Sequence, residues 1–99
     1  IRDRIKTMSR TRAYTAETIA VISRFFAAID TLIAMKKIRG KATYCRIANI
    51  DRLNFNAQSK DYNRGYFQVS WLVPMVRDFG ISSDWLLLGK GKIFINPES

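Results

Sequence analysis

Apolar residues recur at helical spacing over one long stretch, and this pattern constrains the fold more than any other feature of the sequence. The residues concerned are Ile19, Ile22, Phe25, Phe26, Ile29, Leu32, Ile33 and Met35. Spacings of three and four residues place them on one face of a helix, so the sequence predicts a main core helix here. Thr15 and Ser23 are both suitable N-caps. A helix that begins at Ser23 fits a compact domain, whereas one from Thr15 would extend about two turns beyond it.

Basic residues are concentrated in two parts of the chain, which carries a formal charge of +9. Such an excess suggests a polyanionic partner: DNA, RNA or an acidic membrane surface. The first cluster lies near the amino end and comprises Arg2, Arg4, Lys6, Arg10 and Arg12. The second runs through the middle of the chain and comprises Lys36, Lys37, Arg39, Lys41, Arg46, Arg52, Lys60 and Arg64. From Tyr66 to Gly89 the only cation is Arg77. This segregation favours a binding face.

The first cations of the second cluster also suit the end of the core helix. Lys36, Lys37 and Arg39 follow the apolar run, where positive charge complements the carboxyl end of the helix dipole. Gly40 is expected to close the helix in the left-handed conformation. The same side chains could contact phosphate, and the two uses are compatible.

Several functional classes fit the composition poorly. The chain has no His, so the usual general base and common nucleophile pairs and zinc-finger ligand sets are missing. We therefore expect no enzyme activity, no metal, no cofactor and no small-molecule substrate. The single Cys45 cannot form an internal disulfide, and it is expected to be a small core residue of a protein in the reducing cytoplasm. No apolar run long enough to span a membrane and no secretory signal pattern are seen, so we expect no membrane partner.

The central stretch, residues 43–65, is expected to hold two short helices joined by a tight corner. Thr43 can cap the first helix, in which Cys45, Ile47, Ala48 and Ile50 would face inward while Arg46 and Asn49 face outward. Residues 51–55 are interpreted as the connection. The second helix has only Ala57 and Tyr62 to bury, and its other residues are Asn56, Gln58, Ser59, Lys60, Asn63 and Arg64. Asn and Gln can bond adenine and Arg or Lys can bond guanine, so this set suits a helix in the major groove. A solvated surface helix or an Asn-rich loop is the alternative.

The remaining carboxyl half predicts two more helices. Val69, Leu72, Val73, Val76 and Phe79 would form an inward face, with Ser70 as cap, Pro74 near the first turn and Gly80 at the end. Ser82 can cap a short apolar helix that ends near Gly89. Trp71 and Trp85 are expected in the core. Residues 92–95 alternate like a strand.

This layout resembles the lambda-repressor-like helix-turn-helix domains of the Cro and CI type. The most specific likeness is the segment FGISSDWLLLGKG at residues 79–91; Ile47-Ala48 and Arg64-Gly65 follow the family pattern in order. The resemblance covers roughly residues 23–91. It implies an all-α, compact five-helix domain whose third helix lies in the major groove and whose dimers bind paired half-sites. The family usually turns on a Gly between the two motif helices, and residues 51–55 contain none.

The resemblance implies a role for each part of the motif. If Asn56 is the cap of the recognition helix, Ala57, Gln58 and Lys60 face the groove; if Phe55 is, Asn56, Ala57 and Asp61 do. Thr43 would lie where the first motif helix starts against a phosphate, with Tyr44 next in line. The expected phosphate contacts are Lys36, Lys37, Arg39, Lys41, Thr43, Tyr44, Arg46 and Arg64.

The basic amino end, residues 1–14, is expected to be an arm that reaches into the minor groove through Arg2, Arg4, Lys6, Arg10 and Arg12. A helix packed on the core through Ile5 and Met8 is the alternative. Residues 15–91 would form the DNA-binding domain and 92–99 a tail. Together with the resemblance, the sequence predicts a sequence-specific regulator of phage or mobile-element repressor type that binds double-stranded DNA, with a homodimer as a possible assembly. The resemblance also implies a bacterial or phage-derived, nucleoid-associated protein. A nonspecific architectural or protein-interaction factor, antitoxin-like or a recombination accessory protein, stays open, as does an RNA-binding module.

Overall fold

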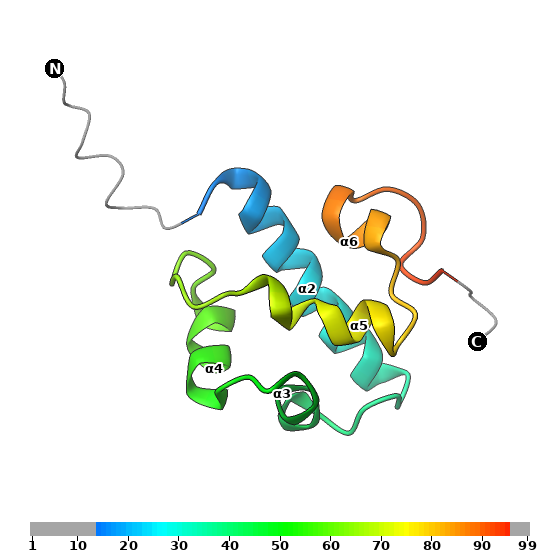
Figure 1. Ribbon diagram of the computed structural model, residues 1–99, viewed down its shortest axis with the longest axis horizontal. Helices are drawn as coiled ribbons and strands as arrows, with labels where there is room; N and C mark the ends of the chain where they lie inside the picture. Colours follow the sequence, from blue (N-terminus) through cyan, green and yellow to red (C-terminus); the bar gives the residue numbers. More distant parts are fainter. Residues whose placement is uncertain (1–13, 96–99) are drawn as a thin grey trace, which may run out of the picture.

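The computed structural model describes residues 14–95, and this part of the chain is all-α, as predicted. Five α-helices and one 3-10 turn surround a single core, and no strand is formed among the described residues (Figure 1). In chain order the elements are α2 (Ala16–Ala34), α3 (Lys41–Ala48), α4 (Arg52–Lys60), η1 (Val69–Trp71), α5 (Val73–Arg77) and α6 (Ser83–Leu88).

Helix α2 begins after Thr15, whose hydroxyl accepts a hydrogen bond from the Thr18 amide at 3.2 Å. A start at Ser23 is therefore wrong, and the extra turns do not overhang the domain because α6 packs beside them. Arg24 fastens the two helices together: its Nε donates to the Leu86 carbonyl at 2.7 Å and its Nη2 to the Leu87 carbonyl at 3.0 Å. These carbonyls belong to the last turn of α6, where free acceptors need partners.

The end of α2 differs from the prediction. The helix stops at Ala34, and Lys36 rather than Gly40 adopts the left-handed conformation, with φ of 62°. Gly40 is extended, with φ of −176°, and is the N-cap of α3. The predicted closing residue is wrong because the helix ends six residues before Gly40, and the glycine is the N-cap of the next helix.

Aromatic rings fill the core around Phe25. Its ring centroid lies 5.0–6.1 Å from those of Phe26, Tyr44, Phe55, Phe67 and Trp71. The four pairs other than Phe25–Trp71 are edge-to-face, and pairs of this kind add about 0.5–1.5 kcal/mol each beyond burial. The cluster joins residues from α2, α3, α4 and η1, so it fixes the positions of α3 and α4. Trp71 is buried as predicted, whereas Trp85 packs against the core and stays partly exposed. Cys45 is buried, and this burial raises the pKa of its thiol.

The segment before α5 is a 3-10 turn, so the residues that face the core differ from those that the sequence pattern predicted. Leu72, Pro74 and Met75 are buried, while Val69 and Val73 are 74% and 44% exposed. A 3-10 turn has about three residues per turn instead of 3.6, so a spacing counted for a continuous helix puts these valines on the wrong side. Pro74 lies in the first turn of α5, as predicted, but Ser70 is inside η1 and caps nothing.

Helix α6 has the predicted ends. The Ser82 hydroxyl accepts from the Trp85 amide at 3.3 Å, and Gly89 closes the helix with φ of 72°. Only Leu86 of this apolar helix is fully buried. Beyond it the chain returns to residues 80–82: the Ser82 amide donates to the Ile93 carbonyl at 2.7 Å, and the Ile95 amide to the Gly80 carbonyl at 2.9 Å. The strand expected at residues 92–95 is thus reduced to one antiparallel bridge between Ile81 and Phe94.

Candidate nucleic-acid interface

Helix α3 starts three residues earlier than predicted. Gly40 is its N-cap and makes no side-chain cap bond, and Thr43 is the third helical residue, half-buried. Thr43 donates its amide to the Gly40 carbonyl at 3.2 Å, so it is not the cap. Tyr44 and Cys45 form the buried face, which leaves Ile47 42% exposed instead of inward-facing.

The turn between α3 and α4 is short, and a left-handed Asn takes the place of a glycine. Asn49 has φ of 58°, a conformation that Asn tolerates better than most residues. Ile50 follows, buried, with its amide bonded to the Cys45 carbonyl at 2.8 Å. Asp51 then caps α4 by accepting from the amides of Leu53 at 2.8 Å and Asn54 at 3.1 Å.

Residues 51–55 are therefore not the connection but the start of the second helix. Both proposed registers, with Asn56 or Phe55 as the cap, are wrong. Asn56 and Ala57 lie in the middle of α4, Lys60 is its last residue, and Asp61 follows its end. Asp at position 51 is a capping signal that could have located the start of this helix. The buried residues of the helix are Phe55 and Gln58, which are three residues apart.

Gln58 is fully buried, which corrects its predicted role in reading bases. Its Nε2 donates to the Tyr62 carbonyl, and its Oε1 accepts from the Tyr66 amide at 2.9 Å. Both ends of the amide are thus used to hold the loop that follows α4. The predicted inner residue Tyr62 lies outside the helix and stacks on Phe26, with ring centroids 5.6 Å apart.

Tyr44 is also fully buried, so its expected contact with phosphate is wrong. Its hydroxyl donates to the Trp71 carbonyl at 2.6 Å and accepts from the Met75 amide at 3.1 Å. Burial raises the pKa of Tyr44 above its usual range. The side chain connects α3 to the η1–α5 segment and thereby orients the α3–α4 pair.

The exposed side chains of α4 are polar with one exception. Arg52, Asn54, Asn56 and Lys60 are exposed, Ala57 and Ser59 are half-buried, and Leu53 is 78% exposed. The sequence pattern did not identify Arg52, Leu53 and Asn54 as residues of the second helix, because residues 51–55 were interpreted as the connection. These three residues occupy the first turn of the helix.

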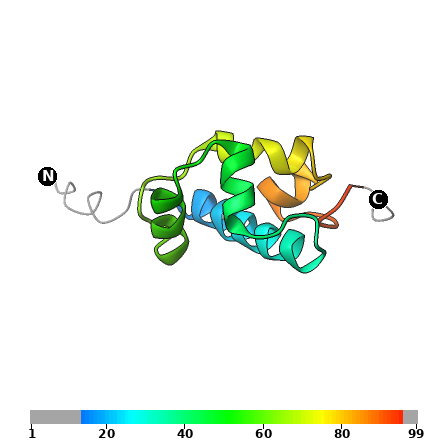
Figure 2. The ribbon, with the colours of Figure 1, turned by 90° about the horizontal axis from the view of Figure 1, so that it is seen from below.

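Exposed cations lie on α4 and on the segments that precede and follow it in the chain. Figures 1 and 2 show the loop after α2, α3 and α4 side by side along one edge of the molecule. From Lys36 to Arg64 the sequence has eight cations and two carboxylates, and one of these, Asp51, is engaged as a cap. The exposed cations are Lys36, Lys37, Arg39, Lys41, Arg46, Arg52, Lys60 and Arg64.

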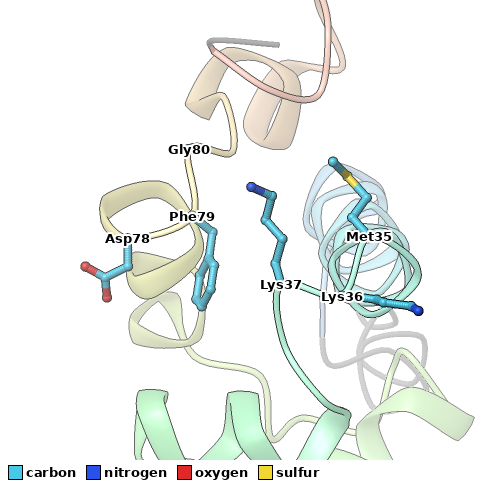
Figure 3. A pocket seen from close by; sticks show the side chains of 6 residues that line it. All are labelled: Met35, Lys36, Lys37, Asp78, Phe79 and Gly80. Carbon is cyan, nitrogen blue, oxygen red and sulfur yellow. The ribbon is translucent and has the colours of Figure 1, made fainter. Parts of the chain in front are cut away.

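The cations nearest the end of α2 diverge. A shallow pocket there is lined by Met35, Lys36, Lys37, Asp78, Phe79 and Gly80 (Figure 3). Lys37 points into the space beside Phe79, whereas Lys36 points away from it. The structure therefore does not bring Lys36 and Lys37 together on a single phosphate position.

The predicted arm residues Arg2, Arg4, Lys6, Arg10 and Arg12 lie outside the described residues. Tyr14, the last residue of that predicted segment, belongs to the folded domain. Its amide donates to Asn63 Oδ1 at 3.2 Å, and its hydroxyl donates to the Phe67 carbonyl at 3.2 Å and accepts from the Phe67 amide at 2.8 Å. The chain thus enters the domain beside the loop that follows α4.

Searches against protein-family models, curated proteins and solved structures each returned no match. Within residues 14–95 no helix has the length and apolar character needed to cross a membrane. The same residues contain no group of three or more His, Cys, Asp or Glu side chains that could hold a metal ion.

Proposed function

We propose that this protein is a non-enzymatic, sequence-specific double-stranded DNA-binding protein, a transcriptional regulator of phage or mobile-element repressor type. In this proposal α3, the turn at residues 49–51 and α4 form a helix-turn-helix of the lambda-repressor-like kind, and α4 enters the major groove. The likeness of residues 79–91 to that family supports the proposal, as does the short turn between the two helices.

The observation that carries the proposal is the surface of α4. The helix buries only Phe55 and Gln58 and leaves Arg52, Leu53, Asn54 and Asn56 exposed in its first half. In helix-turn-helix proteins the amino-terminal residues of the second helix contact base edges. Arg suits guanine and Asn suits adenine, because each can make two hydrogen bonds to those bases in the major groove. These residues replace Gln58 and Asp61 as the proposed readers.

Phosphate contacts would come from the surrounding cations. Lys41 and Thr43 lie in the first turn of α3, whose amide groups favour an anion and lack a side-chain cap. Arg46 on α3 and Lys60 and Arg64 at the far end of α4 are exposed and can contact the backbone on either side of the groove.

A second copy of the chain is the proposed protein partner. Val69, Val73 and Leu87 are exposed around an apolar hollow between η1, α5 and α6, and Arg77 at its rim is neutralised by Asp78 through bonds of 2.9 and 2.8 Å. Those bonds hold the pKa of the Asp78 carboxyl below its usual range. Because this patch has no net charge, two copies can meet there without the repulsion that two facing basic surfaces would cause.

The test is an in vitro selection from random duplex DNA, followed by competition of the selected duplex against scrambled duplex, single strands and RNA. The proposal predicts a defined, preferred duplex, and symmetric half-sites if the dimer binds. The architectural alternative rests on the eight cations, which bind phosphate whatever the sequence. It predicts strong binding with no preferred duplex, and that result would exclude our proposal.

A further inference from the structure

Leu53 is the one side chain of α4 whose exposure the fold does not explain. It is 78% exposed on the second residue of the helix, between the polar residues Arg52 and Asn54. The core contacts of α4 are supplied by Phe55 and Gln58 instead.

The position of Leu53 directs it toward whatever lies beyond the amino end of α4. Side chains of a helix lean toward its amino end and cover the turn before their own Cα. Asp51 fixes where α4 begins, because its carboxylate accepts a hydrogen bond from the Leu53 amide at 2.8 Å. Leu53 and its two polar neighbours therefore form the leading surface of the helix.

Within the major groove the thymine C5-methyl is the apolar group that a side chain can contact on a base edge. An isobutyl group offers no hydrogen bond, so it cannot distinguish bases by their donors and acceptors. We infer that Leu53 reads a thymine methyl group in the recognised half-site. This inference rests on the proposed function, because it assumes that α4 lies in the major groove.

The test uses the duplex obtained by selection and replaces each thymine in turn by deoxyuridine. This change removes only the methyl group and keeps the base-pairing edge. Wild-type protein should lose about threefold to fivefold in affinity at one thymine per half-site, the change that burial of one methyl group supports. Leu53→Ala should bind the thymine and uracil duplexes equally.

Leu88→Ala is the matched control, because Leu88 is 62% exposed but lies on α6 rather than on α4. It should keep the thymine preference of the wild type. Both variants change exposed side chains, and equal melting temperatures will show that both fold.

If a preferred duplex is selected but no thymine-to-uracil change matters, or the preference survives in Leu53→Ala, the inference is overturned while the proposed function stands. If Leu53→Ala instead changes the oligomeric state without DNA, Leu53 serves a protein contact and the inference also falls. If selection yields no preferred duplex, the proposed function fails, and the inference with it.

Discussion

Replacing Gln58 by Ala should destabilise the protein, because this amide joins α4 to the loop after it. The side chain is fully buried, and the change removes its bonds to the Tyr62 carbonyl and the Tyr66 amide. A neutral hydrogen bond contributes about 0.5–1.5 kcal/mol net, and a buried partner left unsatisfied costs about 1–3 kcal/mol. Tyr66 is 38% exposed, so water can satisfy part of what is lost.

Including the cavity left by the side chain, the expected loss is about 2–3 kcal/mol. For a domain of this size that lowers the melting temperature by roughly 10–20 °C. The assay is urea denaturation followed by far-UV circular dichroism. Asn56→Ala is the control on the same helix, since Asn56 is exposed and its removal should change stability by less than about 0.5 kcal/mol.

If Gln58→Ala is as stable as Asn56→Ala, the amide does not hold the loop as argued. If it also loses base preference while Asn56→Ala keeps it, Gln58 is a base-reading residue after all.

Tyr44→Phe should lose about 1–2 kcal/mol in the same denaturation assay, because the Met75 amide is left without its buried acceptor. The pKa of Tyr44 is raised in the folded state, so its contribution to stability is fully present below the ordinary value of 10.0 and is lost as pH rises beyond it; melting scans should show a smaller alkaline loss of stability in Tyr44→Phe than in the wild type. Asp51→Ala should cost about 0.5–2 kcal/mol through loss of the α4 cap, measured by thermal melting. Cys45→Asp should unfold the domain whereas Cys45→Ala costs about 1 kcal/mol, and an unchanged melting temperature for the Asp variant would contradict the burial of Cys45. Deletion of residues 1–12 should leave the melting temperature nearly unchanged but weaken DNA binding at least about tenfold at moderate salt, with a shallower salt dependence; lower stability or a new sedimentation state before DNA is added would contradict the arm.

Local signals in the sequence predicted much of the fold. The apolar spacing along α2 identified the main helix, and Ser82 and Gly89 marked both ends of α6, because a cap or a left-handed glycine acts within one turn. Local sequence signals do not decide whether Thr15 or Ser23 is the N-cap of α2. The choice depends on Arg24 meeting the end of α6, a contact between residues more than sixty positions apart.

The candidate site was harder to predict, for similar reasons. A buried Gln looks like a surface residue until its partners Tyr62 and Tyr66 are known. The start of α4 was missed because a Gly was expected in the turn, and Asn49 supplies the left-handed conformation instead. Because the predicted start of α4 was several residues too late, the predicted base-reading residues lie mostly in the second half of the helix instead of its first turn.

The most direct test of the central claim compares two variants on the selected and scrambled duplexes across a salt titration. Asn56→Ala should lower the preference for the selected duplex by about 1–3 kcal/mol and relax it at one or two bases. Lys41→Ala should weaken both duplexes alike and reduce the salt slope by about one. If Asn56→Ala leaves the preference unchanged, or weakens both duplexes equally as Lys41→Ala does, then α4 does not read the base sequence.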